Sequence, residues 1–244
     1  QIAQVHLHRE TQRTARAHSA IPTFALIGYT NVGKSSLLNA LTDAGVFVED
    51  KLFATLDTTT RRFELPNQKS VLVIDTVGFI RKLPHLLVAA FKSTLEEACN
   101  ADILLHVVDL SHPLAWEQAK ASMEVLKELN MEGKPIITVL NKVDRLHDPA
   151  LITKLRLTYP KTVLVSAHTG EGFDALFEMM SAELKAQRRQ LVLRIPQSEY
   201  HVVSQIKQNG GVLEELYDGN DIILKVELSV SEAARLEKYR EIME

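Results

Sequence analysis

The residues best suited to chemistry form a glycine-rich loop. They fit the pattern G-x-x-x-x-G-K-[ST] without a mismatch and read Gly28-Tyr29-Thr30-Asn31-Val32-Gly33-Lys34-Ser35. In such a loop, backbone N–H groups and the positive end of the following helix surround a phosphate, and the lysine adds a charge between the β- and γ-phosphates. We therefore predict a phosphate-binding loop in which Lys34 is catalytic, Ser35 ligates Mg²⁺ through its hydroxyl and Ser36 adds a nucleotide contact. A simple glycine-rich turn is the alternative, because so short a pattern also arises by chance.

A second motif, Asp75-Thr76-Val77-Gly78, directly follows the apolar run 71–74. A carboxylate leaving a buried strand beside the phosphate loop is placed to hold Mg²⁺ through a water, which predicts Asp75 as a metal-site residue. Gly78 has no side chain to keep a γ-phosphate away from its amide. A strand that merely ends in a turn produces the same D-x-x-G pattern, so this motif depends on the others for its weight.

The third motif, Asn141-Lys142-Val143-Asp144, follows the apolar run 136–140. The Asp144 carboxylate can accept from both the ring N1–H and the 2-amino group of guanine, whereas adenine would leave it desolvated and without donors. We expect Asn141 to brace the base and the phosphate loop, and the stem of Lys142 to lie over the ring. Ser166-Ala167, after the run 162–165, is expected to offer a backbone N–H to guanine O6.

A guanine-nucleotide switch also requires a threonine that closes over Mg²⁺ and the γ-phosphate. This threonine should lie between the phosphate-loop helix and Asp75. The candidates are Thr55, Thr58, Thr59 and Thr60.

Several segments together resemble the HflX family of ribosome-associated GTPases. They are the phosphate loop, Leu52-Phe53-Ala54-Thr55-Leu56-Asp57, Arg61-Arg62, and Asp75-Thr76-Val77-Gly78-Phe79-Ile80. In that family and in the related Obg proteins, the threonine of Phe-x-Thr-Leu closes over the metal, so the resemblance implies Thr55 as a catalytic residue and Mg²⁺ ligand. It also implies GTP as substrate, GDP as product, the large ribosomal subunit (RNA and protein) as partner, and rescue or splitting of stalled ribosomes as the process.

One position departs from many GTPases, which place a glutamine directly after D-x-x-G to orient the attacking water. This chain has Phe79 there, and we expect its ring to pack beneath the switch. Hydrolysis would then depend on Lys34, Mg²⁺ and backbone groups such as Gly78, so we predict a slow intrinsic rate that a ribosomal partner accelerates. Related GTPases with asparagine at the position of Asn31 bind K⁺ there, and a hydrogen bond within the loop is the alternative role for Asn31.

Two other functions remain open. One is a ribosome-assembly GTPase of the Era type, although the C-terminal part of this chain lacks the Gly-x-x-Gly loop that would favour RNA binding of that kind. The other is a nucleotide-gated binding module with negligible hydrolysis, which is open because of Phe79.

From residue 21 onward, apolar strands alternate with helical segments. This pattern predicts an α/β fold of the P-loop NTPase (Ras-like) type, with a mainly parallel sheet, helices on both faces and the nucleotide at the carboxyl ends of the strands. The expected strands are 24–27, 61–65, 71–74, 103–108, 136–140 and 162–165, and the expected helices are 35–44, 86–98, 114–129, 151–157 and 173–186. By analogy with the family, the strand at 61–65 pairs antiparallel.

After about residue 190 the pattern changes to strand, helix, hairpin and helix. Asp218-Gly219-Asn220 is a hairpin signal, and Ser231 is expected to cap the last helix. We therefore expect a G domain at 21–189 and a small α+β C-terminal domain at 190–244, as in many HflX proteins.

The first twenty residues resemble the end of a cut helix. HflX proteins carry an N-terminal domain and a helical linker, so the resemblance implies that 1–20 is a truncated linker from a missing N-terminal domain. His6, His8 and His18 lack the partners of a metal site and are expected to be exposed.

Composition limits the function classes further. The chain has 244 residues, 45% of them hydrophobic, which is enough for a sizeable core. No run approaches the roughly 20 apolar residues of a membrane span, and no signal peptide is evident. The single cysteine, Cys99, suits a reducing compartment, and we expect a cytoplasmic monomer in which Cys99 is a packing residue.

The net charge of −3 gives no global case for binding nucleic acid. Any contact with RNA must therefore be local. The basic residues gather at Arg61, Arg62, Arg81 and Lys82 on the switches, and at Lys185, Arg188 and Arg189, which we expect to end a helix.

Overall fold

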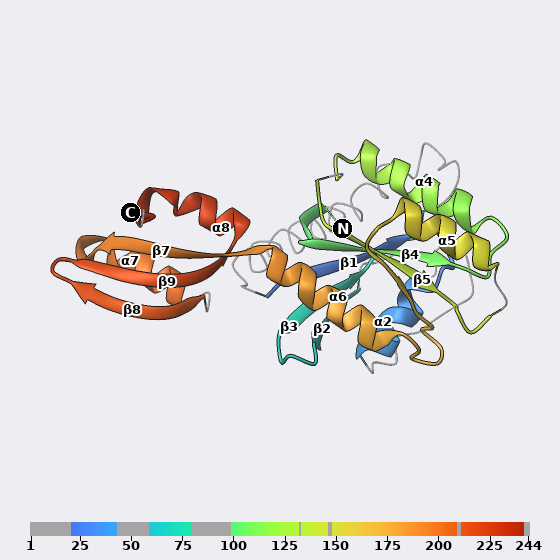
Figure 1. The fold of residues 1–244 in the computed structure, drawn as a ribbon, viewed down its shortest axis with the longest axis horizontal. Helices are drawn as coiled ribbons and strands as arrows, with labels where there is room; N and C mark the ends of the chain where they lie inside the picture. Colours follow the sequence, from blue (N-terminus) through green and yellow to red (C-terminus); the bar gives the residue numbers. More distant parts are fainter. Residues whose placement is uncertain are drawn as a thin grey trace, which may run out of the picture. The chain divides into compact units, whose positions relative to one another are not determined.

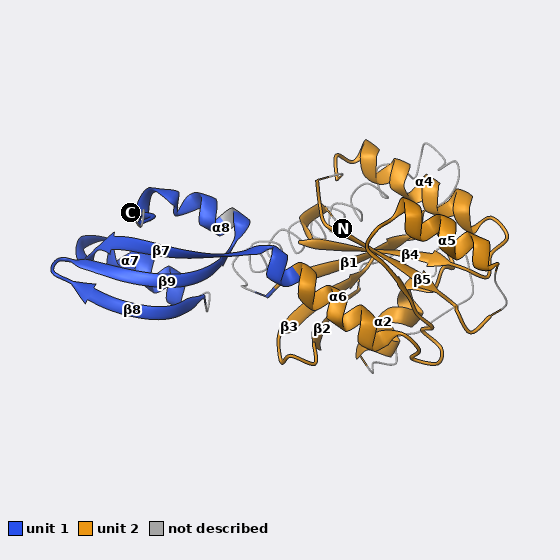
Figure 2. Ribbon diagram, viewed as in Figure 1, with its two compact units in different colours: residues 1–21, 184–244 blue, residues 22–183 orange. Residues whose placement is uncertain are grey.

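A computed structural model of the protein describes residues 21–42, 59–79, 99–131, 133–145, 148–208 and 211–241. The chain divides into two compact units (Figure 2). One is Pro22–Glu183, and the other is Leu184–Glu244, grouped with Gln1–Ile21, of which only Ile21 is described. Each unit has its own sheet and its own hydrophobic cluster. The placement of a domain boundary between residues 189 and 190 stays a prediction.

The first unit contains a six-stranded sheet in the order β2-β3-β1-β4-β5-β6 (Figure 1). The strands are β1 Thr23–Gly28, β2 Thr59–Glu64, β3 Ser70–Asp75, β4 Ile103–Asp109, β5 Ile136–Asn141 and β6 Thr162–Leu164. All pair in parallel except β2, which is antiparallel to β3, as expected for the strand near 61–65. The central strand β4 is buried along its whole length, because helices cover both faces of a parallel sheet.

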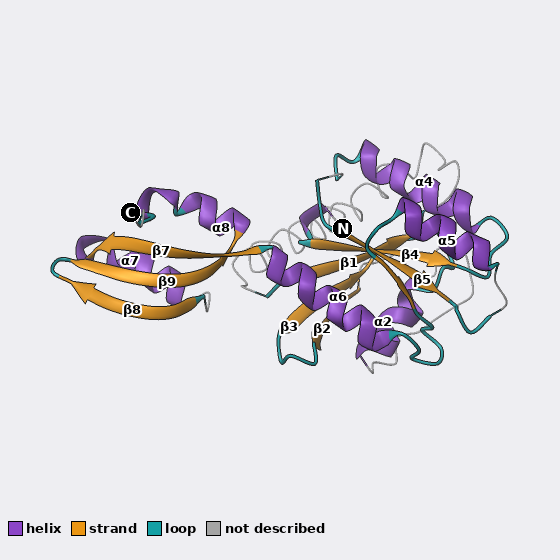
Figure 3. Ribbon diagram, viewed as in Figure 1, coloured by secondary structure: helices purple, strands orange, loops and turns teal. Residues whose placement is uncertain are grey.

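Four described helices cover this sheet. They are α2 Lys34–Thr42, α4 Ala115–Glu128, α5 Pro149–Thr158 and α6 Phe173–Ala186. Figures 1 and 3 show α4 and α5 on one side of the sheet and α2 and α6 on the other. Leu126 of α4 packs with Ala25 of β1, and Leu155 of α5 packs with Leu140 of β5. The expected fold class, a mainly parallel sheet between two layers of helices, is confirmed.

The second unit is a three-stranded antiparallel sheet in the order β7-β9-β8. Its elements are β7 Arg188–Pro196, the 3₁₀ helix η1 Gln197–Glu199, α7 Tyr200–Gln208, β8 Val212–Asp218, β9 Asp221–Ser229, α8 Val230–Arg235 and the 3₁₀ helix η2 Glu237–Tyr239. Alternate residues of β7 and β9 are buried, and Val203 of α7 and Ala233 of α8 pack on that face. Asp218 pairs with Asp221, so Gly219-Asn220 forms the predicted hairpin turn. The small α+β unit expected after the G domain is therefore present.

Two local expectations for this region are wrong. The N-cap of the last α-helix, α8, is Ser229 rather than Ser231: Ser229 Oγ accepts from Glu232 N at 3.2 Å, and Glu232 Oε2 accepts from Ser229 N at 3.1 Å. This reciprocal pair is a capping box, which satisfies two amides at the helix start. Arg188 and Arg189 do not end a helix, because they already pair with Ser229 and Leu228 as the first residues of β7.

Some expectations lie outside the described residues. These are the linker at 1–20, the helix at 86–98, and the residues Thr55, Arg81 and Lys82. Cys99 is partly buried against the cluster that contains Ala101 and Met131, in line with a packing role. No helix within the described ranges is both long and apolar enough to cross a membrane.

Candidate functional site

The glycine-rich loop connects β1 to α2 and is fixed against the motif Asn141-Lys142-Val143-Asp144, which we call the base-reading motif. Gly33 has φ +95°, a conformation that side chains disfavour, and Asn31, two residues before it, also has positive φ, at 63°. A Cβ on Gly33 would lie 2.4 Å from Asn141 Nδ2. Glycine is therefore required here both by the backbone conformation and by the closeness of Asn141. The helix α2 starts directly afterwards, with Leu37 N donating to Gly33 O at 2.8 Å.

Lys34 is a buried cation within this loop. The residue is only 6% exposed. Its Nζ donates to Tyr29 O at 2.9 Å and to Gly28 O at 3.3 Å. Burial lowers the pKa of Lys34 to about 8, an effect that the nearby Asp75 carboxylate partly opposes. A phosphate beside Nζ would favour the charged form further, so this lysine is well placed to bind an anion.

Ser35 and Asp75 meet at the mouth of the same loop. Ser35 Oγ donates to Asp75 Oδ2 at 2.5 Å, and Asp75 is 1% exposed at the end of β3. The pair supplies a hydroxyl and a carboxylate, the hard oxygen donors that Mg²⁺ prefers when it also binds a nucleotide phosphate. These residues therefore fit a magnesium site. Thr55, the third predicted metal ligand, lies outside the described residues.

The D-x-x-G segment lies directly against the phosphate loop. Phe79 N donates to Gly28 O and Thr30 N donates to Phe79 O, both at 2.9 Å. A Cβ on Gly78 would lie 2.7 Å from Thr30 Cα and 2.8 Å from Lys34 Nζ, so only a glycine allows this approach. Gly78 is thus placed beside the lysine that is expected to meet the γ-phosphate.

Phe79 itself is buried, as the sequence indicated. The residue is 2% exposed and packs in the cluster that contains Ala25 and Ile27. A phenyl ring offers no hydrogen bond, and this one lies in the core. Phe79 therefore does not orient a water molecule in this conformation.

The base-reading motif follows β5 and is tied to the phosphate loop by two hydrogen bonds. Asn141 Nδ2 donates to Val32 O at 2.9 Å, and Lys142 Nζ donates to Asn31 O at 2.9 Å. Because β1 and β5 lie on either side of β4 in a parallel sheet, their carboxyl ends meet at one edge. The fold thereby joins residues that are more than a hundred positions apart in the chain.

Ser166 and Ala167 complete the base side of the site. Ser166 Oγ donates to Asp144 Oδ1 at 2.6 Å, and this hydrogen bond is the main reason that the pKa of Asp144 lies below its usual value. Asp144 is therefore ionised and acts as an acceptor at neutral pH. Ala167 N donates to Asn141 Oδ1 at 3.0 Å, so the amide expected to meet guanine O6 also braces the motif.

Some of these residues line a cavity of about 300 Å³. Its lining combines loop residues with residues of the base-reading motif. Its lining consists of Gly33, Ser36, Asn141, Lys142, Asp144, Arg145, Ala167 and His168. Arg145 and His168 were not expected from the sequence, although each directly follows a predicted site residue.

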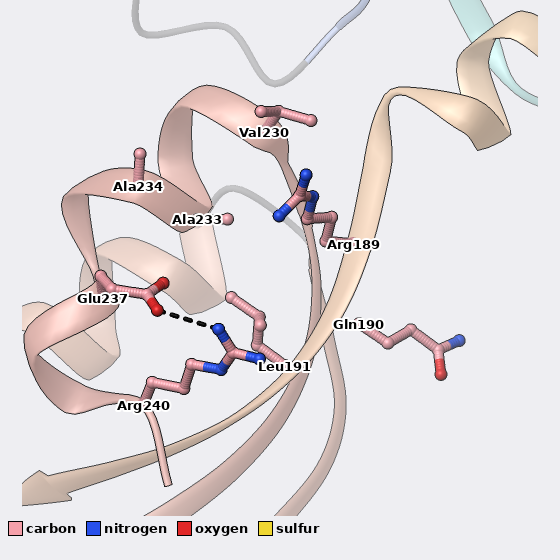
Figure 4. Close-up of a pocket in the computed structure, with 8 residues that line it drawn as sticks. All are labelled: Arg189, Gln190, Leu191, Val230, Ala233, Ala234, Glu237 and Arg240. Carbon is pink, nitrogen blue, oxygen red and sulfur yellow. Dashed lines mark hydrogen bonds and ion pairs between the residues drawn. The ribbon is translucent and has the colours of Figure 1, made fainter. Parts of the chain in front are cut away.

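A larger hollow, of about 540 Å³, lies in the second unit. Figure 4 shows Arg189 and Arg240 reaching toward it, with Arg240 Nη1 donating to Glu237 Oε1 at 2.9 Å. The lining residues are Arg189, Gln190, Leu191, Val230, Ala233, Ala234, Glu237 and Arg240. No motif residue is among them, so the smaller cavity is the candidate site despite its size.

A further residue of the site, besides Arg145 and His168, was missed by the sequence reasoning. Asp109 ends β4, and its Oδ2 accepts from Lys142 Nζ at 2.6 Å. The available signal was its position, since Asp109 follows a buried apolar run just as Asp75 and Asn141 do.

Comparisons with known proteins agree with this geometry. The family described as 50S ribosome-binding GTPase matches residues 23–142. The GTPase HflX of Chlamydia pneumoniae is 49% identical over 228 residues, which cover 93% of this chain and 48% of that protein. The GTPase HflX of Lacrimispora saccharolytica is 44% identical over 224 residues, which cover 92% of this chain and 52% of that protein. The chain thus spans about half the length of these curated relatives.

A solved structure also resembles the chain. It is a GTP-binding protein from the archaeon Sulfolobus solfataricus in complex with GDP, with a TM-score of 0.54 and 30% identity, covering 74% of this chain and 57% of that chain. The motif geometry, the sheet order and these relatives point the same way, and we conclude that the chain belongs to the HflX family of GTPases.

Proposed function

We propose that this protein is a GTP-binding and GTP-hydrolysing molecular switch that acts on the large ribosomal subunit. The observation that carries the proposal is the pair of hydrogen bonds that joins the base-reading motif to the phosphate loop. Asn141 Nδ2 donates to Val32 O, and Lys142 Nζ donates to Asn31 O. These bonds hold the phosphate site and the base site at a fixed spacing, so one nucleoside polyphosphate can engage both. Asp144 then favours guanine, because its carboxylate needs two donors on the base.

Ser35 and Asp75 would hold Mg²⁺, and we propose Thr55 as a further ligand. When bound, the ion neutralises charge on the β- and γ-phosphate oxygens. Lys34 supports the same oxygens with its ammonium group, and Gly78 leaves room for a phosphate to approach its backbone. GTP would order the Thr55 and Gly78 segments, and hydrolysis would release them, which changes the affinity for the partner.

The intrinsic rate of hydrolysis is proposed to be slow. Phe79 is buried and supplies no group to orient water, so the remaining groups act by positioning and by charge. A ribosomal contact would then complete the site. As a finer point, K⁺ bound at Asn31 would add positive charge near the β- and γ-phosphates, and equal hydrolysis rates in K⁺ and Na⁺ buffers would rule this out.

The biological setting of the proposal rests on the comparisons with known proteins. The names of the relatives and the 50S ribosome-binding description support a ribosomal partner, and we propose rescue or splitting of stalled ribosomes in the cytoplasm, by a monomer. In this scheme residues 21–189 are the G domain, 190–244 a docking or stabilising module, and 1–20 a linker to a further domain. The aliphatic core of the second unit supports its role as a separate module.

The test is GTP hydrolysis by this chain with and without purified large subunits. Lys34→Ala serves as the control, because it removes the positive charge that is proposed to bind the phosphate. We expect slow turnover alone and a clear acceleration by subunits. Equal rates in both conditions would contradict a ribosome-stimulated switch. Tight GTP binding with no turnover in either condition would favour the nucleotide-gated binding module. The burial of Phe79 is the observation that supports this alternative.

A further inference from the structure

Asp109 is a nearly buried carboxylate whose two oxygens both accept hydrogen bonds. The residue is 7% exposed. Oδ1 accepts from Ser111 N at 2.9 Å and from Ser111 Oγ at 2.6 Å, while Oδ2 accepts from Lys142 Nζ at 2.6 Å. A buried carboxylate is costly unless donors satisfy it, and here three donors hold it in one orientation. Asp109 therefore offers Lys142 a fixed anionic partner at the end of β4.

Lys142 connects this carboxylate to the nucleotide cavity. Its backbone has φ 66°, which is uncommon for a residue with a side chain, and its Nζ also donates to Asn31 O. The stem passes close to the phosphate loop, since Lys142 Cε lies 3.8 Å from the place of a Cβ on Gly33. Lys142 also lines the cavity that contains Asp144. The ammonium group is thus anchored at one end while the stem forms part of the wall of the cavity.

We propose that Asp109 is a positioning residue for guanine binding: it holds the Lys142 ammonium in place, and with it the stem against which the base packs. The inference rests on the proposed function of this site. Without the carboxylate, the ammonium keeps only the Asn31 carbonyl and turns toward water, because the Lys142 side chain is already 21% exposed. The stem then regains rotamer freedom that binding must remove again.

The direct test compares Asp109→Asn with a matched control, Glu183→Gln. Glu183 forms an ion pair with Lys161 at 2.7 Å, and its side chain is 10% exposed, against 2.6 Å and 9% for Asp109. Lys161 precedes β6 and lies at the amino end of the strands, opposite the motifs. In titrations with a fluorescent GDP analogue and Mg²⁺, Asp109→Asn is expected to bind about tenfold more weakly, and Glu183→Gln as the unchanged protein does.

A double-mutant cycle separates positioning from general disturbance. Lys142→Met keeps an apolar stem but removes the ammonium, so Asp109→Asn should cause little further loss in that background. The loss caused by Asp109→Asn alone should be the same for GDP and for inosine diphosphate, which lacks the 2-amino group that Asp144 reads. A change in the ratio of the two affinities would show instead that Asp144 has moved, and would overturn the proposal.

Two further outcomes would also overturn it. One is unchanged GDP affinity in Asp109→Asn, and the other is additive losses in the cycle. If Asp109→Asn does not fold, Asp109→Glu, which keeps the charge and displaces it by one methylene, takes its place in the same cycle. Failure of the unchanged protein to bind GDP would instead remove the proposed function, so the two failures are distinct.

Discussion

Asp144 is the residue proposed to select the base, and Ser166 Oγ donates to its carboxylate and lowers its pKa. We predict that Asp144→Asn weakens GDP binding roughly 100-fold. The asparagine NH₂ group, a hydrogen-bond donor, would then face a donor N–H group of guanine that the carboxylate had accepted from. The same variant should bind xanthosine diphosphate better, because xanthine carries a carbonyl oxygen in place of the 2-amino group. Competition of a labelled nucleotide by both diphosphates measures the change. Ser166→Ala, which keeps the carboxylate, should retain the preference for guanine, and an unchanged preference in Asp144→Asn would contradict the assignment.

His106 is a buried ionisable residue of β4 that has no place in the nucleotide chemistry. Among the described residues neither ring nitrogen has a hydrogen-bond partner, and the ring packs edge-on against Tyr159. Burial lowers the pKa of His106 from 6.5 to about 4, so the folded protein keeps it neutral.

Stability should therefore depend on pH in a known direction. Below pH 6.5 the unfolded chain takes up a proton at His106 that the folded protein refuses until about pH 4. We predict that the free energy of unfolding falls over this window by up to about 3 kcal/mol from this residue. Urea unfolding at pH 7 and pH 4.5 measures the fall, which should be smaller in His106→Leu. An equal fall in both proteins would show that other groups are responsible.

At the level of the elements, the start of α8 depends on the reciprocal bonds between Ser229 and Glu232. Ser229→Ala removes the acceptor for the Glu232 amide and should lower the stability of the second unit by about 1 kcal/mol. Ser229→Thr is the matched control, because it keeps a hydroxyl at the cap. Denaturant unfolding followed by far-UV circular dichroism measures both. Equal stability of Ser229→Ala and Ser229→Thr would show that this cap contributes little.

The elements that the sequence predicted well are those with long, uniform apolar runs. The apolar run at 103–108 indicates a strand that is buried on both faces, as β4 is in the centre of the sheet. The ends of elements were less certain, because they depend on a few polar residues. Ser229 and Ser231 are both good caps, and only the glutamate three residues after Ser229 distinguishes them. Arg188 and Arg189 carry no apolar signal, yet they pair with β9 as part of an edge strand.

The candidate site shows the same division. Motif spacing was sufficient to name Lys34, Asp75 and Asn141, because each motif is short and follows a strand directly. Asp109 belongs to no such motif, and its bond to Lys142 joins residues 33 positions apart. That contact exists only because β4 and β5 are neighbours and end together. Strand order, more than residue type, was the missing information.

At the level of the whole molecule, the chain consists of two units that each bury their own apolar residues. The second unit packs Leu193, Leu224 and Val203 into one cluster, and the first has separate clusters around β1 and β4. The nucleotide motifs in the described ranges all belong to the first unit. Ligand binding should therefore stabilise only that unit directly.

This separation predicts two unfolding transitions, of which only one responds to nucleotide. The only tryptophan, Trp116, lies in α4 of the first unit, so its fluorescence reports that unit, whereas circular dichroism reports both. GDP with Mg²⁺ at about 100 times its Kd should stabilise the tryptophan transition by about 2.7 kcal/mol, because only the folded unit binds it. A second transition, seen by circular dichroism alone, should not move. Lys34→Ala should lose the shift, and a single transition that moves as a whole in both signals would mean that the two units unfold together.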